Sequence, residues 1–171
     1  PKSKWILMVD ADEIVTKELK QEIIEVVNTG SETSMYRVRR KDFFQGKWLK
    51  YSSGYPTWFP RLFKYGEVIV KREINEEYDT KGEITNLNSH LLHYPFNKGI
   101  NWWFEKHNLY SKLESEKMKI EINEPLQFSM ILSSDSVTRR KFLKRFSYKL
   151  PFRPQIVFMI FFILKKGFLD G

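Results

Sequence analysis

Residues 5–9, Trp-Ile-Leu-Met-Val, form an unbroken apolar run that ends abruptly at Asp10 and Asp12. Because a strand covered on both faces needs apolar side chains on both, this run predicts a buried strand of an α/β sheet, followed by an acidic turn. Thr16 is the expected N-cap of a helix that ends before Gly30. The apolar positions of that helix recur at helical spacing, at Leu19, Ile23, Val26 and Val27.

The rest of the chain adds more strands and one long helix. Residues 35–40 alternate between apolar and basic side chains, which predicts a strand with Tyr36 and Val38 on its inner face. A hairpin is expected around Gly46. The other expected elements are strands at 58–65, 68–70 and 86–94, a polar acidic loop at 71–81 and a helix at 100–119. We expect one domain over residues 1–132 and a separate arm over residues 133–171.

The charge of the chain is distributed unevenly. Residues 139–171 hold 9 Lys and Arg against Asp170 alone, whereas residues 1–138 hold 20 basic and 20 acidic residues, so the whole +8 belongs to the arm. A neutral body with a basic arm argues against a nucleic-acid-binding body. The absence of cysteine excludes disulfides, thiolate metal sites and cysteine nucleophiles.

The arm interleaves cations with large apolar side chains. The cations are Arg139, Arg140, Lys141, Lys144 and Arg145, and Phe142, Leu143 and Phe146 fall among them at helical spacing. This pattern is typical of a helix that lies on an anionic membrane surface. The apolar segment 156–164 can enter the membrane interface, but it is too short for a transmembrane span. Two alternatives stay open: a non-catalytic module whose arm binds membrane or nucleic acid, and an arm that packs on more of its own domain.

Asp10 and Asp12 are the candidate ligands of a divalent cation. Mg²⁺ and Mn²⁺ prefer oxygen ligands, and an ion at the carboxyl end of a strand can neutralise a departing diphosphate. The alternative is a helix-entry turn, in which acidic side chains favour the first helical turn. Glu13 fits that alternative best.

Residues 5–13 resemble the D-x-D strand of the family 2 glycosyltransferases, which have the GT-A fold. Later segments are similar, in order, to the bacterial lipopolysaccharide core β-1,4-glucosyltransferase branch: Gly-Tyr-Pro at 54–56, Pro-Arg-Leu-Phe at 60–63, Asn-Glu at 75–76, Leu-Leu-His-Tyr at 91–94 and the closing 166–171. The resemblance implies an α/β, Rossmann-like mixed sheet, of which this chain is the C-terminal portion. The nucleotide-binding part that precedes D-x-D in the family is expected upstream.

The resemblance also implies roles for individual residues. Asp10 and Asp12 hold the metal and the donor diphosphate, and Glu76 is the candidate base that deprotonates the acceptor hydroxyl. Relatives usually have His before this Glu, where this chain has Asn75, and Glu77 and Asp79 are neighbouring alternatives. His93 is a possible further metal ligand, because some GT-A enzymes supply a late histidine.

Other side chains are candidates for contact with donor or acceptor. Arg61 lies in an apolar run and needs an anionic partner, which is either the donor or a structural carboxylate. Gly54, Tyr55 and Trp58 belong to an aromatic loop that is suited to stacking on a sugar ring. The other candidates are Glu13, in the acidic turn, and Lys106 and Tyr110, on the long helix.

The implied reaction is inverting, metal-dependent transfer from a nucleotide sugar to a lipid-linked glycan such as lipopolysaccharide core. The donor expected from the family is similar to UDP-glucose. The implied place is the cytoplasmic side of the inner membrane, where the enzyme would be peripheral.

Overall fold

The computed structural model describes residues 3–30, 32–70 and 78–171. The chain divides into two compact units. The sheet unit comprises the chain up to Asn97 together with Asp170, and the helical unit comprises Lys98–Leu169 and Gly171. The boundary predicted at 132/133 rests on composition and resemblance, and it stays a prediction.

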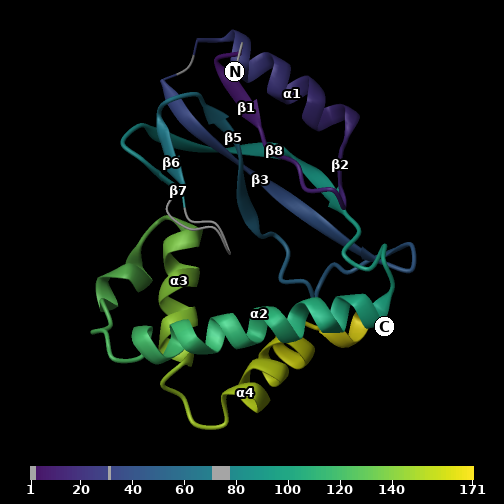
Figure 1. Ribbon diagram of the computed structural model, residues 1–171, viewed down its shortest axis with the longest axis vertical. Helices are drawn as coiled ribbons and strands as arrows, with labels where there is room; N and C mark the ends of the chain where they lie inside the picture. The colour runs from purple at the N-terminus through teal and green to yellow at the C-terminus, as the bar shows by residue number, and fades with distance from the viewer. Residues whose placement is uncertain (1–2, 31, 71–77) are drawn as a thin grey trace. The chain divides into compact units, whose positions relative to one another are not determined.

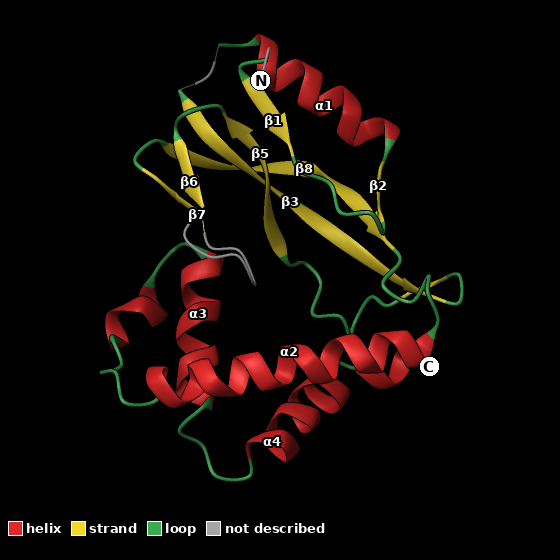
Figure 2. Ribbon diagram, viewed as in Figure 1, coloured by secondary structure: helices red, strands yellow, loops and turns green. Residues whose placement is uncertain are grey.

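The sheet unit is built on a mixed sheet, shown in yellow in Figure 2. Along the sheet the strands are β1 (Trp5–Leu7), β5 (Trp58–Lys64), β3 (Thr33–Phe44), β8 (Glu83–His93) and β2 (Glu13–Val15), and β4 (Lys47–Trp48) pairs with the end of β3. The β3–β8 pair is parallel, and the other pairs are antiparallel. A separate two-stranded sheet joins β6 (Val68–Val70) to β7 (Tyr78–Thr80). The predicted mixed α/β class is therefore confirmed.

Helix α1 (Lys17–Asn28) packs its apolar stripe against the sheet (Figure 1). The Oγ1 atom of Thr16 accepts a hydrogen bond from the backbone N–H of Leu19 at 3.2 Å, which confirms the predicted cap. Leu19 is fully buried in the core cluster. Its buried neighbours there are Tyr36, Val38, Leu62, Leu87 and Leu91, and Ile23, Val26 and Val27 pack against them as predicted.

The first strand differs from the prediction. The apolar run was expected to be covered on both faces, but β1 lies at the edge of the described sheet, where its pairing partner is β5. Ile6 and Leu7 are both more than a third exposed. A continuous apolar run predicts a strand correctly, but it does not reveal how many neighbours the strand has.

Two short strands also depart from the prediction. The chain forms β2 between the acidic turn and α1, so Glu13 begins a strand and does not lie in the first turn of the helix. Residues 78–80 form β7 inside the segment expected to be a polar loop. The hairpin around Gly46 is confirmed, with Phe43 paired to Trp48 across the turn.

The helical unit contains α2 (Ile100–Glu121), η1 (Phe128–Leu132), α3 (Ser136–Ser147), α4 (Arg153–Met159), η2 (Ile160–Leu164) and η3 (Gly167–Leu169). Helix α3 crosses the C-terminal part of α2 (Figure 1), and Lys144 forms an ion pair with Glu114 of α2 at 3.1 Å. Phe142 is buried inside this unit. Among the residues described, no helix combines the length and the apolar character needed to cross a membrane.

Candidate functional site

Three strand ends meet at His93. Because β3 runs parallel to β8, Asp42 near the end of β3 lies level with His93 at the end of β8. Because β2 runs antiparallel to β8, Glu13 at the start of β2 lies beside the same histidine. The backbone N–H of Tyr94 donates to the carbonyl of Asp12 at 2.8 Å, which holds the acidic turn at this edge. Sheet topology thus assembles the acidic cluster, by which we mean Asp10, Asp12, Glu13 and Asp42 with Arg40, Arg61 and His93.

His93 lies between two carboxylates. Its Nδ1 atom is 2.6 Å from Oδ1 of Asp42, and its Nε2 atom is 3.5 Å from Oδ2 of Asp12. An ionised carboxylate can only accept, so Nδ1 donates to Asp42, and in a neutral ring Nε2 then carries the lone pair. In that neutral tautomer, Nε2 faces Asp12 with the lone pair that a histidine uses to bind a metal ion. Histidines that bind metals have the same arrangement, with a carboxylate on the other ring nitrogen.

Arg61 joins the other two carboxylates of the turn. Its Nη2 donates to Oδ2 of Asp10 at 2.6 Å and to Oε1 of Glu13 at 2.7 Å. Burial acts to lower the pKa of Arg61, but the attraction and hydrogen bonds of Glu13 and then Asp10 raise it overall. The Arg61 side chain is only 7% exposed. The anionic partners of Arg61 are therefore Asp10 and Glu13 of the same chain.

Glu13 is the most enclosed member of the cluster. Its side chain has no exposed area, and it also lies 3.5 Å from Arg40 and accepts the backbone N–H of Asp10 at 3.1 Å. Asp10, in contrast, has a side chain that is 50% exposed. Glu13 thus holds the turn together, while Asp10 and Asp12 reach the surface.

The spacing of Asp12 and His93 can be compared with that of two ligands of one divalent cation. Two ligands of one Mg²⁺ or Mn²⁺ ion, each about 2.1 Å from it, lie about 3 Å apart, close to the Asp12–His93 separation. Within residues 3–30, 32–70 and 78–171, no group of three or more acidic or histidine side chains forms a complete metal site. Mg²⁺ commonly takes one or two protein ligands and fills its other positions with phosphate oxygens and water. The cluster suits that mode of binding.

The remaining predicted contacts lie in other surroundings. Gly54 is buried, the ring of Tyr55 meets Trp48 edge-on at 5.2 Å, and Trp58 lies 5.6 Å from the guanidinium of Arg39. In the helical unit, Lys106 and Tyr110 lie together on α2, with the ammonium 5.5 Å from the ring centre.

The predicted base, Glu76, lies outside the described residues, as does Glu77. The next described residue is Tyr78, whose hydroxyl donates to the sulfur of Met8 at 3.4 Å. Met8 precedes Asp10 by two positions. Asp79, the third alternative, is exposed on β7.

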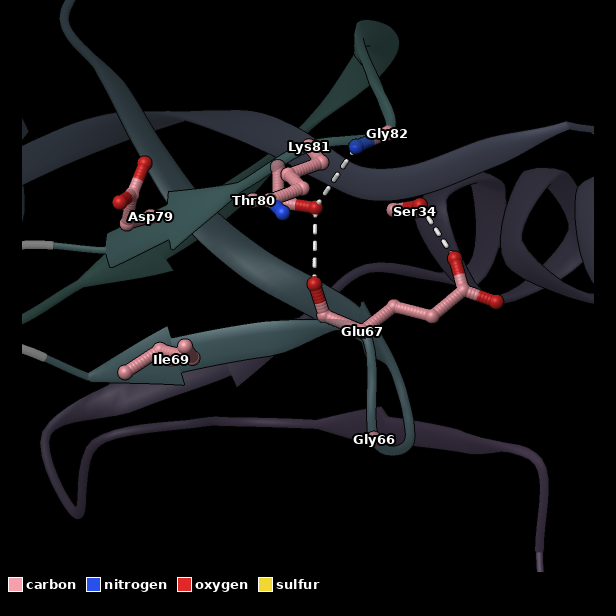
Figure 3. A pocket seen from close by; sticks show the side chains of 8 residues that line it. All are labelled: Ser34, Gly66, Glu67, Ile69, Asp79, Thr80, Lys81 and Gly82. Carbon is pink, nitrogen blue, oxygen red and sulfur yellow. Dashed lines mark hydrogen bonds between the residues drawn. The ribbon is translucent and has the colours of Figure 1, made fainter.

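A separate hollow of about 480 Å³ lies beside β6 and β7, between the turn that precedes β6 and the turn that follows β7 (Figure 3). Ser34 lines it at the start of β3, whereas Asp42 of the acidic cluster lies near the end of the same strand. The hollow is therefore not part of the acidic cluster.

Sequence reasoning missed Asp42 and Arg40. The two are themselves paired, with Arg40 Nε donating to Oδ1 of Asp42 at 3.0 Å. One signal was present in the sequence: aspartate is depleted in strands, yet Asp42 stands directly before two phenylalanines in a strand-forming segment. A carboxylate in that position is expected to have a cation or a hydrogen-bond donor as its partner.

No protein-family model matches the chain, and no solved structure matches it. The functional interpretation therefore depends on the geometry of the acidic cluster and on the motifs themselves.

Proposed function

We propose that the sheet unit carries the metal and diphosphate site of an inverting glycosyltransferase of the GT-A type, similar to family 2. The observation that carries this proposal is the Asp42–His93–Asp12 arrangement, directly after the D-x-D motif.

Each residue of the cluster has a role in the proposal. Asp12 and His93 would hold Mg²⁺ or Mn²⁺, and Asp42 orients the ring of His93. Arg61 positions Asp10, whose exposed carboxylate is available at the same edge. The bound ion would supply charge neutralisation of the nucleoside diphosphate as it leaves. Glu76 is the proposed base, because its carboxylate belongs to the motif that resembles the family and an inverting transfer needs one base.

The finer assignments belong to the same proposal. The donor is a nucleotide sugar such as UDP-glucose, and the acceptor is a lipid-linked glycan such as lipopolysaccharide core. The enzyme would work at the cytoplasmic side of the inner membrane, since both the basic arm and such an acceptor point to an anionic lipid surface.

Nucleotide release tests the proposed reaction. The full chain is incubated with a panel of UDP-sugars, Mn²⁺ and a lipid-linked oligosaccharide acceptor, and free UDP is measured. Asp12→Asn should reduce UDP release by about a hundredfold or more, because the leaving diphosphate loses its counter-charge. Glu25→Gln, which removes an exposed carboxylate of α1, is the matched control and should leave release unchanged. Release by Asp12→Asn equal to that of the unaltered chain would exclude the proposed role of Asp12.

A further inference from the structure

The segment from Phe152 to Leu164 presents large apolar side chains to solvent. Phe152 is 76% exposed at the tip of the turn before α4, and Leu164 is 74% exposed at the end of η2. Between them lie further exposed residues of α4 and η2, namely Phe158, Met159, Ile160, Phe162 and Ile163. A soluble surface rarely gathers so many contiguous apolar side chains without a partner.

The exposed aromatic rings of this segment are ordered into a ridge. Phe158 and Phe162 stack at 5.0 Å with 15° between their planes, and Phe168 of η3 meets Phe162 at 6.0 Å. Ile156, Val157 and Phe161 are half-buried on the inner side of the same helical run. The run is therefore apolar on both sides. One side packs within the helical unit, and the other exposes apolar side chains that a binding partner would bury.

The positive charge around the exposed apolar segment indicates which kind of partner would bury it. From Ser136 to Leu169 the sequence contains 9 Lys and Arg and no Asp or Glu. Lys165 and Lys166 directly follow the apolar run, and the ammonium of Lys165 lies 5.1 Å from the ring centre of Phe161. Apolar side chains within a segment that carries cations and no carboxylates complement an anionic lipid surface.

Several cations of α3, which the sequence predicted to contact the membrane, are engaged in contacts within the helical unit. Lys144 is paired with Glu114, and Arg145 is paired with Glu124 at 2.7 Å. Arg139 donates to the carbonyls of Ser133 and Ser134, and Phe142 is buried. Much of the predicted lipid-binding face of α3 is therefore occupied by contacts within the helical unit.

We propose that residues 152–164 form the membrane-inserting element of the protein, lying in the headgroup region of an anionic bilayer with Lys165 and Lys166 at its border. The helical part, α4 with η2, is about 18 Å long, well short of the bilayer core, so it lies in the plane of the interface. Phe152, Phe158 and Phe162 enter the lipid. The inference does not depend on the proposed transfer reaction, because lipid binding is measured without donor or acceptor.

Vesicle flotation tests the proposal directly. The full chain is mixed with vesicles of phosphatidylethanolamine and phosphatidylglycerol, and in parallel with vesicles of phosphatidylcholine alone. The chain should float with the anionic vesicles and bind the neutral ones far more weakly. Phe158→Ser should lower partitioning about tenfold, because one phenyl group no longer leaves water. Lys165→Gln with Lys166→Gln should also lower it about tenfold and reduce its dependence on salt.

The matched control is Phe104→Ser on α2. Phe104 is 56% exposed and Phe158 is 59% exposed, and each has an aromatic neighbour close by in the chain, Trp103 for Phe104 and Phe162 for Phe158. Phe104→Ser should leave partitioning unchanged, and an equal loss in both variants would overturn the assignment to residues 152–164. Far-ultraviolet circular dichroism of each variant confirms that the helices persist.

A tryptophan probe separates insertion from surface attachment. The chain has five tryptophans of its own, so the emission of Phe162→Trp is compared with that of the unaltered chain. The difference, which belongs to the new indole, should shift to the blue with anionic vesicles and be quenched by brominated lipid chains. Absence of quenching would overturn insertion. If Phe158→Ser abolishes self-association in light scattering but leaves flotation unchanged, the ridge is an interface between copies of the chain, and the proposal is wrong. Binding to an oligonucleotide in preference to anionic vesicles would also overturn it.

Discussion

The Nδ1 atom of His93 lies 2.6 Å from a carboxylate oxygen of Asp42, a residue 51 positions earlier in the chain. Parallel pairing of β3 with β8 creates this contact, since the register places the two residues level. The contact orients the ring so that Nε2 faces Asp12. A residue that lies outside every recognised motif therefore determines how the motif carboxylate and the histidine can act together.

Removing the Asp42 carboxylate should weaken metal binding without removing a ligand. Asp42→Ala is expected to lower Mn²⁺ affinity about tenfold to a hundredfold, as happens when the partner of a metal-binding histidine is lost. Asp42→Asn should give an intermediate affinity, because its amide oxygen still accepts from Nδ1. Titration calorimetry in the presence of UDP measures both. Unchanged Mn²⁺ affinity in Asp42→Ala would contradict this role of Asp42.

Breaking the buried ion pair of Glu13 and Arg61 should lower the free energy of unfolding strongly, whereas replacing both residues with apolar ones should lower it little. Glu13→Gln leaves the buried guanidinium without the more buried of its two carboxylate partners, and we expect it to lower the free energy of unfolding by about 3–5 kcal/mol. Glu13→Leu combined with Arg61→Met should recover much of that loss, since both charges are gone. Urea unfolding of both variants tests this, and additive losses in the double variant would contradict it.

Acid should weaken the contact between Asp170 and the loop at residues 50–52. Burial acts to raise the pKa of Asp170, but hydrogen bonds from Ser52, Tyr51 and Lys50 outweigh it and hold the pKa below its ordinary value of 3.8. A carboxylate with a lowered folded-state pKa adds stability above its unfolded-state pKa, and that stability is lost as pH falls through the folded value.

Asp170→Asn provides the comparison for this effect. The variant should be less stable than the unaltered chain at neutral pH, and the two should converge as the pH falls below the ordinary value of 3.8. Urea unfolding at a series of pH values gives the difference. A difference that persists unchanged at low pH would show that hydrogen-bond geometry, and not the charge of Asp170, is responsible.

Gly82 is required for steric reasons. A Cβ at this position would lie 1.8 Å from the Oγ of Ser34, which is only 1% exposed and donates to Glu67 beside the hollow in Figure 3. Gly82→Ala should therefore cost about 1–3 kcal/mol of stability. Ser34→Gly in the same chain should restore part of the loss by vacating the space. Thermal unfolding of the single and double variants tests this, and an unchanged melting temperature for Gly82→Ala would contradict it.

The local elements of this fold were predictable because their signals are local. The Thr16 cap, the alternation of Tyr36 and Val38 in β3 and the turn at Gly46 each depend on residues within a few positions of one another. Strand β2 has only three residues, too few for a periodic signal, so the sequence predicted a direct passage into the helix.

The candidate site was predictable only in part for the same reason. Asp10, Asp12 and His93 stood out as residue types, but the approach of His93 to Asp12 depends on pairing between β2 and β8. Likewise, the periodicity of α3 showed that Phe142 is on an apolar face, but not that this face is buried within the helical unit. Long-range pairing and packing carry no signature within a short stretch of sequence.

The central claim is that Asp12 and His93 together hold a divalent cation that is shared with a diphosphate. Electron paramagnetic resonance of Mn²⁺ in the presence of UDP tests it most directly, because the signal of the free aqueous ion disappears on binding. We predict tight binding by the unaltered chain, a loss of affinity of at least about tenfold in both Asp12→Asn and His93→Gln, and unchanged binding in Glu25→Gln. Failure of the unaltered chain to bind Mn²⁺ with UDP, or equal binding by all four proteins, would show that the cluster is a structural ion-pair network and would contradict the claim.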